Sequence, residues 1–186
     1  CGGLGTPAAW VLAASGLGEL TLVDPDRVAL TDLHRQVLYG ESDLGRPKVD
    51  AMAGALSRRF PGLRVRGLSL RVDAANVSEL VAGADLVLEC TDDPVTKYLV
   101  NDAAVLCEVP VVHGGAIRFH AQAWLTLPLH SACLRCVFPV PPRPGDAPAC
   151  REAGILGPVA GVGGSLQAWL AVEYLRGRVH LDRLLD

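Results

Sequence analysis

The chain has 186 residues, of which 50% are hydrophobic and 20% charged, and its formal net charge is −3. This length and composition are typical of one folded domain and exclude a disordered or fibrous chain. The slight acidity and an aromatic content of 5% argue against nucleic acid and anionic membranes as partners. No apolar run approaches the roughly 20 residues that span a bilayer, and no signal peptide is visible. We therefore expect a cytoplasmic protein.

Helical and strand-like segments alternate along the chain. Apolar or alanine-rich stretches bounded by proline or glycine predict helices over 6–15, 47–60, 77–81, 94–107 and 163–176. Short apolar or alternating runs predict strands over 19–24, 63–70, 84–90, 109–113 and 121–127. Because helices separate the first four strands, the pattern indicates an α/β fold with a largely parallel sheet. The last strand follows another strand directly, which predicts an antiparallel extension.

The opening residues 1–5 (CGGLG) lead directly into the first predicted helix. Glycines let the backbone approach a phosphate at a helix N-terminus, and Asp24, at the end of the next strand, is spaced to hold a ribose hydroxyl. The alternative is a plain glycine-rich helix entry, and the turn alone does not separate NAD from ATP. Since the chain opens inside this turn without a preceding strand, we expect the first strand of the fold to be missing from this fragment.

A cluster of polar residues follows the second predicted element of the chain. Arg35, Gln36, Arg46 and Lys48 lie within 14 residues of one another. Cations beside a mononucleotide site suit a polyphosphate that must be neutralised and have its leaving group stabilised. An NAD-dependent dehydrogenase has no use for them. The alternative interpretation is a solvated, charged loop.

The segment 89–93 (ECTDD) ends a predicted strand. Ligands bind at that edge of a parallel sheet, and a carboxylate there can hold Mg²⁺ against phosphate oxygens. Helix capping is the alternative, because Asp92 or Asp93 ahead of Pro94 is a good N-cap. Both roles can coexist, one for each aspartate.

The six cysteines do not resemble a small secreted disulfide framework. Cys133 and Cys136 form a C-x-x-C pair, which supplies two of the four ligands of a tetrahedral zinc site; a redox pair or two buried thiols are the alternatives. Cys150, in the proline-rich stretch 130–150, is a candidate nucleophile, although an isolated cysteine is more often inert. The histidines, His113 among them, show no spacing typical of a metal site or a catalytic triad.

Several motifs occur in one order along the chain: GGLG, LVDPD, HRQ, GRPK, CTD, YLVNDA, GGAIRFHAQ, CLRCVFP and ACREAGILGP. Together they resemble the ThiF/MoeB/HesA family, bacterial relatives of ubiquitin-activating enzymes, from residue 1 to about residue 177. The resemblance implies a single adenylation domain over 1–186, truncated at both ends. It also implies a Rossmann-like, mostly parallel sheet flanked by helices, with an antiparallel extension and a cysteine-containing crossover loop over 130–150.

The resemblance further implies an activity. Such enzymes bind ATP and Mg²⁺ and join the C-terminal glycine carboxylate of a ubiquitin-like sulfur-carrier protein of the ThiS/MoaD kind to AMP, releasing pyrophosphate. A homodimer is the implied assembly. The implied nucleotide site consists of Gly2, Gly3, Gly5, Asp24, Asp32, Arg35, Gln36, Lys48 and Asp92. In it, Arg35 and Lys48 would stabilise the pentacoordinate transition state and Asp92 would bind Mg²⁺.

The resemblance assigns roles to three cysteines as well. Cys133 and Cys136 match the first half of the family's zinc site, whereas the second half is absent from this sequence. Cys150 matches a catalytic position that in some members forms a covalent link to the carrier. The family usually has Asn where Asp32 and Asp93 stand, and carboxylates there would weaken ATP binding unless they are metal-bound or turned away. Adenylation of a peptide C-terminus, or a catalytically silent carrier-binding scaffold, are the remaining alternatives.

Overall fold

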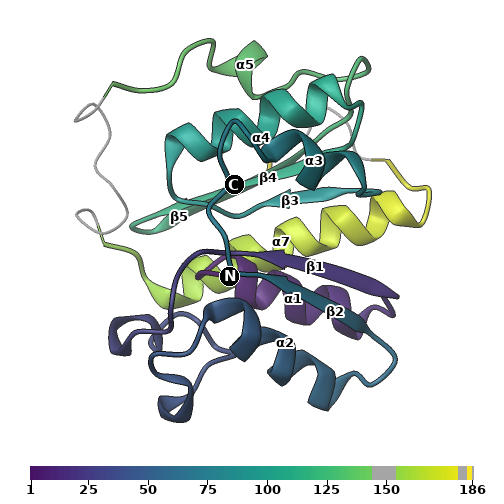
Figure 1. Ribbon diagram of the computed structural model, residues 1–186. Coiled ribbons are helices and arrows are strands. Elements are labelled where there is room, and N and C mark those ends of the chain that lie inside the picture. The colour runs from purple at the N-terminus through teal and green to yellow at the C-terminus, as the bar shows by residue number, and fades with distance from the viewer. Residues whose placement is uncertain (144–153, 180–183, 186) are drawn as a thin grey trace.

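The computed structural model describes residues 1–143, 154–179 and 184–185. The helices are α1 (Gly5–Ala14), α2 (Lys48–Arg59), α3 (Val77–Ala82), α4 (Pro94–Leu106), α5 (Leu134–Val137) and α7 (Gly157–Leu175). The strands are β1 (Glu19–Val23), β2 (Arg64–Leu68), β3 (Val87–Glu89), β4 (Val111–Ile117) and β5 (His120–Thr126). Two 3₁₀ turns, η1 (Leu30–Asp32) and η2 (Glu41–Asp43), lie in the stretch between β1 and α2 (Figure 1).

The strands form two hydrogen-bonded groups within the described residues. β1 pairs with β2 in parallel, and β3 pairs with β4 in parallel, while β5 runs antiparallel to β4. These pairings confirm the α/β fold, the parallel strands and the antiparallel extension that the sequence predicts. In the second group, Glu89 lies opposite His113, which in turn lies opposite Trp124. These three side chains therefore share one row of the sheet and one of its faces.

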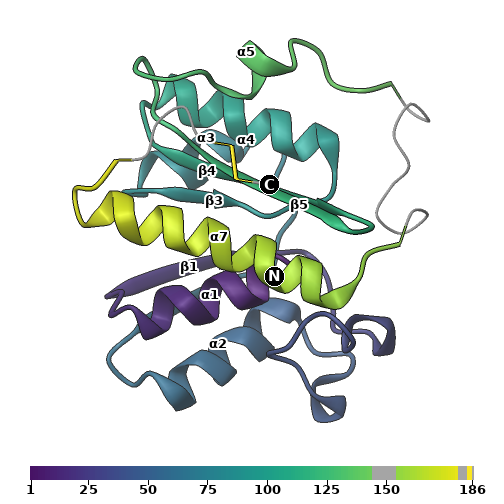
Figure 2. The same cartoon turned by 180° about the vertical axis from the view of Figure 1, so that it is seen from behind.

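Helices cover the strands on both sides (Figures 1 and 2). α7 packs against α1 and against β4 and β5, whereas α3 and α4 lie on the opposite face of the β3–β5 group, and α2 packs against β1 and β2. Buried apolar side chains fill the spaces between these layers, for example Leu22, Met52 and Leu56 near α2, Val112, Leu125 and Leu170 under α7, and Val77, Val81 and Val111 under α3. None of the helices in the described residues has the length and apolar character needed to cross a membrane.

The structure corrects the predicted start of the last helix. α7 begins at Gly157, six residues before the start at 163 that the sequence indicates. The added turns are rich in glycine, which disfavours a helix in isolation. Farther along the same helix, α7 lies very close to the start of α1: a Cβ on Gly164 would lie only 2.1 Å from the carbonyl oxygen of Leu4 and 2.7 Å from Cγ of Pro7. Close packing of two helices therefore outweighs the low helix propensity of this segment.

This close contact gives a testable prediction. We expect Gly164→Ala to lower the free energy of unfolding by about 1–3 kcal/mol, because the added methyl group must push α7 away from α1. Gly161→Ala, on the same helix, is the matched control: a Cβ there meets nothing within 4 Å, so alanine should stabilise the helix by up to about 1 kcal/mol. Urea unfolding of both variants measures the difference, and equal effects would contradict the packing argument.

Candidate functional site

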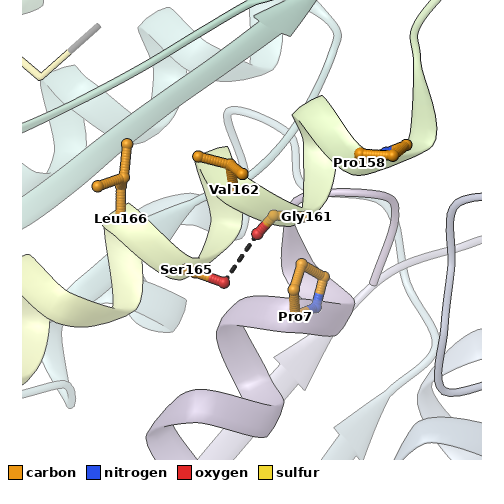
Figure 3. A pocket seen from close by; sticks show the side chains of 6 residues that line it. All are labelled: Pro7, Pro158, Gly161, Val162, Ser165 and Leu166. Carbon is orange, nitrogen blue, oxygen red and sulfur yellow. Dashed lines mark hydrogen bonds between the residues drawn. The ribbon is translucent and has the colours of Figure 1, made fainter.

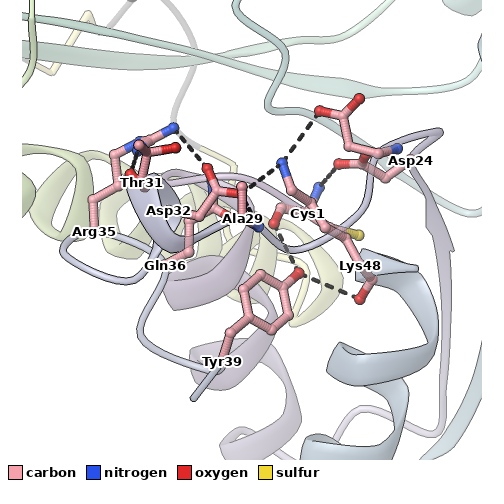
Figure 4. A network of polar contacts seen from close by, with 10 residues as sticks. Cys1, Asp24, Ala29, Thr31, Asp32, Arg35, Gln36, Tyr39 and Lys48 are labelled. Atoms are coloured by element: carbon pink, nitrogen blue, oxygen red, sulfur yellow. Dashed lines mark hydrogen bonds and ion pairs between the residues drawn. The ribbon is translucent and has the colours of Figure 1, made fainter. Parts of the chain in front are cut away.

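The glycine-rich turn before α1 lies against side chains from the stretch between β1 and α2 (Figure 4). A Cβ on Gly3 would lie 3.5 Å from Cδ of Arg35, and one on Gly2 would lie 4.0 Å from Nε2 of Gln36. Asp24, directly after β1, lies at the start of this turn, with its carboxylate 2.8 Å from the backbone nitrogen of Cys1. The structure thus brings Asp24, Arg35 and Gln36 to the glycine turn.

Asp32 lies at the centre of this cluster and is buried, at 6% exposure. One carboxylate oxygen accepts hydrogen bonds from Nε2 of Gln36 at 2.9 Å and from Arg35 at 3.2 Å. The other accepts from the backbone N–H of Ala29 at 3.1 Å and lies 3.6 Å from Nζ of Lys48. Its negative charge is therefore compensated by two cations, which shows how the protein accommodates an aspartate at this position.

Lys48 is the first residue of α2, and its side chain is 7% exposed. Its ammonium group lies 3.2 Å from Oδ2 of Asp26 as well as 3.6 Å from Asp32. The hydroxyl of Tyr39, which the sequence analysis overlooked, donates to the carbonyl oxygens of Cys1 at 2.9 Å and of Lys48 at 3.3 Å. These two hydrogen bonds link the start of α2 to the glycine turn, and they thereby fix the position of Lys48 relative to the turn.

The two adjacent aspartates after β3 have different surroundings. Asp93 is the N-cap of α4: it accepts from the backbone N–H groups of Val95 at 3.3 Å and Thr96 at 3.0 Å, and from the Thr96 hydroxyl at 2.6 Å. Burial raises the pKa of Asp93, but these hydrogen bonds outweigh it and lower the pKa below its ordinary value. Asp92 is exposed and its side chain has no hydrogen bond or ion pair with the described residues. The predicted cap is confirmed, and it is Asp93.

The segment that leads to Asp92 runs beside the glycine turn. A Cβ on Gly5 would lie 3.8 Å from Cβ of Cys90. Gln167, from α7, holds the same segment: its amide nitrogen donates to the carbonyl oxygens of Glu89 at 2.8 Å and Val112 at 3.3 Å, and its oxygen accepts from Cys90 Sγ at 3.4 Å. The carboxyl end of β3 therefore lies next to the turn and is fixed there by α7.

The C-x-x-C pair is placed on the first turn of α5, away from the glycine turn. Sγ of Cys133 and Sγ of Cys136 are 3.7 Å apart. Two thiolates at Zn–S distances of about 2.3 Å and a tetrahedral angle lie about 3.8 Å apart, so the pair fits two ligands of a zinc ion. Within residues 1–143, 154–179 and 184–185, no third cysteine, histidine or carboxylate joins them. Cys150 lies outside the described residues.

A buried ion pair that the sequence does not predict lies at the carboxyl end of β3. Glu89, 2% exposed, forms an ion pair with Lys97 of α4 and accepts from the backbone N–H and the hydroxyl of Thr91, at 2.7 and 2.5 Å. The Lys97 ammonium also donates to the carbonyl oxygen of Gly114 at 2.5 Å. The spacing of Glu89 and Lys97, eight residues apart across a helix start, carries no signal in the sequence alone.

This ion pair lines a pocket of about 340 Å³ on the α4 face of the sheet. The imidazole of His113 stacks on the ring of Trp124 in the same pocket, with ring centroids 4.9 Å apart and planes inclined by 26°. Both ring nitrogens of His113 and Nε1 of Trp124 are buried, and no hydrogen-bond partner for them is found among the residues that the structure describes. No role for His113 is predictable from the sequence, because only the pairing of β4 with β5 brings it to Trp124.

A second hollow, of about 450 Å³, lies between α1 and α7 (Figure 3). It is lined by Pro7, Pro158, Gly161, Val162, Ser165 and Leu166. Its one hydroxyl group, that of Ser165, already donates to the carbonyl oxygen of Gly161 at 2.8 Å. The hollow is apolar and offers no side chain for chemistry.

The surroundings of His113 make the stability of the protein depend on pH. Burial, assisted by the charge of Lys97, lowers the pKa of His113 from 6.5 to about 3, and Glu89 is the other charged group facing it. Between those pH values the unfolded chain binds a proton that the folded one does not. The stability that the protein gains from keeping His113 neutral is therefore fully present above pH 6.5, and it is lost as pH falls toward 3.

We expect the free energy of unfolding of the wild type, relative to His113→Phe, to fall by up to about 1.4 kcal/mol per pH unit below pH 6.5. Phenylalanine keeps a ring against Trp124 and removes the titrating group. Urea unfolding of both proteins between pH 5 and 8 measures the difference. A difference that stays constant over this range would contradict the prediction.

Comparisons with known proteins extend over the whole chain. Residues 1–185 match the model of the ThiF family. The chain is 42% identical to the sulfur carrier protein adenylyltransferase of Thermus thermophilus over 181 residues, which cover 95% of this chain and 67% of that protein. It is 41% identical to the SAMP-activating enzyme E1 of Haloferax volcanii over 174 residues, which cover 94% of this chain and 64% of that protein.

Solved structures with the same fold are also known. The fold superimposes on that of E. coli MccB with ATP with a TM-score of 0.84 and 25% identity, covering 98% of this chain and 56% of MccB. For the microcin C7 biosynthetic enzyme MccB in complex with N-formylated MccA, the TM-score is 0.86 and the identity 26%, over 98% of this chain and 57% of that chain. The chain thus spans little more than half the length of MccB and 64% of that of the Haloferax relative.

Proposed function

This chain belongs to the ThiF family, and from that premise we propose that it is the adenylation domain of an enzyme that activates the C-terminal glycine carboxylate of a ubiquitin-like sulfur-carrier protein with ATP. One observation carries the proposal: Asp24, Arg35 and Gln36 gather around the glycine turn in a chain 42% identical to a sulfur carrier protein adenylyltransferase. Cations next to such a turn suit a polyphosphate substrate.

In the proposed reaction a carboxylate oxygen of the carrier attacks the α-phosphorus of ATP. A new P–O bond forms, the bond from the α-phosphorus to the bridging oxygen of the β-phosphate breaks, and pyrophosphate leaves with that electron pair. The product is a carrier acyl-adenylate. Arg35 and Lys48 offset the negative charge that spreads over the pentacoordinate phosphorus. The surrounding network positions both: Asp32 touches the two cations at 3.2 and 3.6 Å.

The remaining residues of the proposed nucleotide site bind rather than react. Gly2, Gly3 and Gly5 let the backbone approach the phosphates at the start of α1. Asp24 takes the ribose hydroxyls, and Gln36 contacts a phosphate. Asp32 acts in the site through the residues it orients, since both of its oxygens have partners within the protein.

The proposed enzyme uses two kinds of metal ion, Mg²⁺ and Zn²⁺. The exposed carboxylate of Asp92 suits Mg²⁺, which, when bound, neutralises phosphate oxygens and favours departure of pyrophosphate. Cys133 and Cys136, with sulfurs 3.7 Å apart, would supply half of a structural zinc site. We propose further that Cys150 is the thiol of a later transfer step to the carrier, and that the enzyme is a homodimer, both on the family resemblance of the sequence.

A second candidate is adenylation of a peptide C-terminus in a biosynthetic pathway. The likeness of the fold to the microcin C7 biosynthetic enzyme MccB favours it. Both candidates share the nucleotide site and the chemistry at the α-phosphorus, and they differ in the acyl substrate.

Carrier-dependent exchange of pyrophosphate into ATP tests the proposal, with the complete protein and a panel of sulfur carriers. Exchange with one carrier is the expected result. No exchange with any carrier, together with measurable ATP binding, would favour a peptide substrate. Absence of ATP binding as well would overturn both candidates and leave a silent scaffold.

A further inference from the structure

The network of polar contacts beside the glycine turn contains more carboxylates than cations. Its carboxylates are those of Asp24, Asp26 and Asp32, and its cations are Arg35 and Lys48. The Lys48 ammonium lies 3.2 Å from Asp26 and 3.6 Å from Asp32. The backbone N–H of Asp26 donates to the Asp24 carboxylate at 2.8 Å. Three carboxylates against two cations leave this network with an excess of negative charge.

Neighbouring arginines do not reverse this balance. Arg46, which is close to Lys48 in the sequence, forms an ion pair of 2.6 Å with Asp43. Arg27 is exposed and donates to the carbonyl oxygen of Gly45 at 2.7 Å, so water and salt screen its charge. A triphosphate therefore meets a site whose fixed charge, within the described part of the chain, is not positive.

Asp32 is the buried carboxylate that contacts both cations of this network (Figure 4). Its side chain is 9% exposed, whereas that of Asp26 is 60% exposed. A buried charge is screened much less than an exposed one. Arg35 and Lys48 are the groups proposed to meet the phosphates, and Asp32 lies 3.2 and 3.6 Å from them. A phosphate that approaches either cation is therefore repelled by the Asp32 carboxylate at close range.

We propose that Asp32 makes the site select the Mg²⁺ complex of the nucleotide over the free nucleotide. Bound Mg²⁺ cancels part of the negative charge of a triphosphate. Repulsion by a fixed carboxylate grows in proportion to the charge of the ligand, so Asp32 disfavours free ATP more than it disfavours MgATP. Asp32 is thus a specificity-determining residue. The inference rests on the proposed function, because it takes the ligand of the site to be ATP.

The Kd for ATP in the complete protein, measured by calorimetry with Mg²⁺ and with EDTA, tests this inference. Asp32→Asn removes the charge and keeps the shape of the side chain. We expect it to lower the ratio of the Kd for free ATP to the Kd for MgATP by about tenfold, the scale of one unit charge at close range. Gln36 can turn its amide to accept a hydrogen bond from the new amide group, since its oxygen has no partner among the described residues.

Two further variants complete the design. Asp26→Asn removes a charge that contacts the same ammonium group but is largely exposed, and it should lower the ratio by less than Asp32→Asn does. Asp50→Asn, exposed in the first turn of α2, makes the same change of net charge outside the network and should leave the ratio unchanged. Urea unfolding shows whether each variant is folded, and if Asp32→Asn is not, Asp26→Asn decides.

An unchanged ratio in the deciding variant would overturn the inference. So would an equal fall of the ratio in Asp50→Asn, or weaker binding of both forms of ATP by folded Asp32→Asn, which is the result of a purely structural role. Free ATP that binds to Asp32→Asn but not to the wild type supports the inference, and free ATP that binds to neither overturns it.

These outcomes are distinct from those that test the proposed function. A lowered ratio in Asp32→Asn supports the selection of MgATP even if no carrier supports pyrophosphate exchange. Exchange with a carrier, together with an unchanged ratio, overturns the selection and leaves the proposed function intact. Absence of any ATP binding by the wild type overturns both.

Discussion

Asp92→Ala is expected to lower carrier-dependent adenylation by at least ~100-fold while leaving the free energy of unfolding unchanged. The loss is on the scale of removing a group that stabilises charge in the transition state, since Asp92 is proposed to hold the Mg²⁺ that neutralises the phosphates. Stability should not change, because the Asp92 side chain is exposed and makes no hydrogen bond or ion pair with the residues that the structure describes. Single-turnover formation of the acyl-adenylate measures the first effect and urea unfolding the second.

The neighbouring aspartate provides the control. Asp93→Ala removes the N-cap of α4, which holds the N–H groups of Val95 and Thr96, and should cost about 1 kcal/mol of stability. Its effect on adenylation should be small, because its carboxylate is engaged by the helix. The two substitutions therefore separate activity from stability at adjacent positions. Near-wild-type adenylation by Asp92→Ala would refute the assignment of the metal ligand.

Lys97→Met is expected to destabilise the protein by about 3–5 kcal/mol, the usual cost of removing one partner of a buried ion pair. The Glu89 side chain is fully buried, and without the ammonium group it keeps only the two hydrogen bonds from Thr91. Methionine retains most of the volume and the flexible stem of lysine, so loss of packing contributes little. Thermal or urea unfolding measures this change in the free energy of unfolding.

Two further proteins test whether burial is the cause. The double variant Glu89→Gln, Lys97→Met contains no buried charge at this place and should recover much of the lost stability. Arg64→Met breaks an ion pair of 2.9 Å with Glu19, whose side chains are 82% and 57% exposed, and should cost less than about 1 kcal/mol. If Lys97→Met lowers the free energy of unfolding no more than Arg64→Met does, burial does not strengthen the contribution of the Glu89–Lys97 pair.

Much of the fold was predictable from local patterns. The spacing of apolar residues places α2 and α4 within about one residue of their observed ends, because these helices have proline at their start and a clear apolar face. The predicted start of α7 was wrong by six residues: Gly157 and Gly161 weaken a helix in isolation, and it is the close packing of α7 against α1 that favours one. Such an approach is a property of two segments far apart in the chain, which no local pattern contains.

The candidate site was likewise predictable only in part. The glycine turn, the cations and the adjacent aspartates follow from residue type and spacing. The compensation of Asp32 by Arg35 and Lys48 does not, since it depends on how the stretch between β1 and α2 folds back on itself. The pairing of His113 with Trp124 depends on the register of β4 against β5. A shift of one residue would send one of the two rings to the other face of the sheet.

The position of α7 has a consequence for the order in which the protein is made. Gly164 packs on the carbonyl of Leu4, and Gln167 holds the carboxyl end of β3, yet both residues leave the ribosome after every other part of the nucleotide site. Translation proceeds from the N-terminus at roughly 5–20 residues per second. A nascent chain that has emerged only through β5 therefore carries the side chains of the proposed nucleotide site but not the helix that secures their backbone. The proposed nucleotide site is therefore held in place only after α7 has been synthesised.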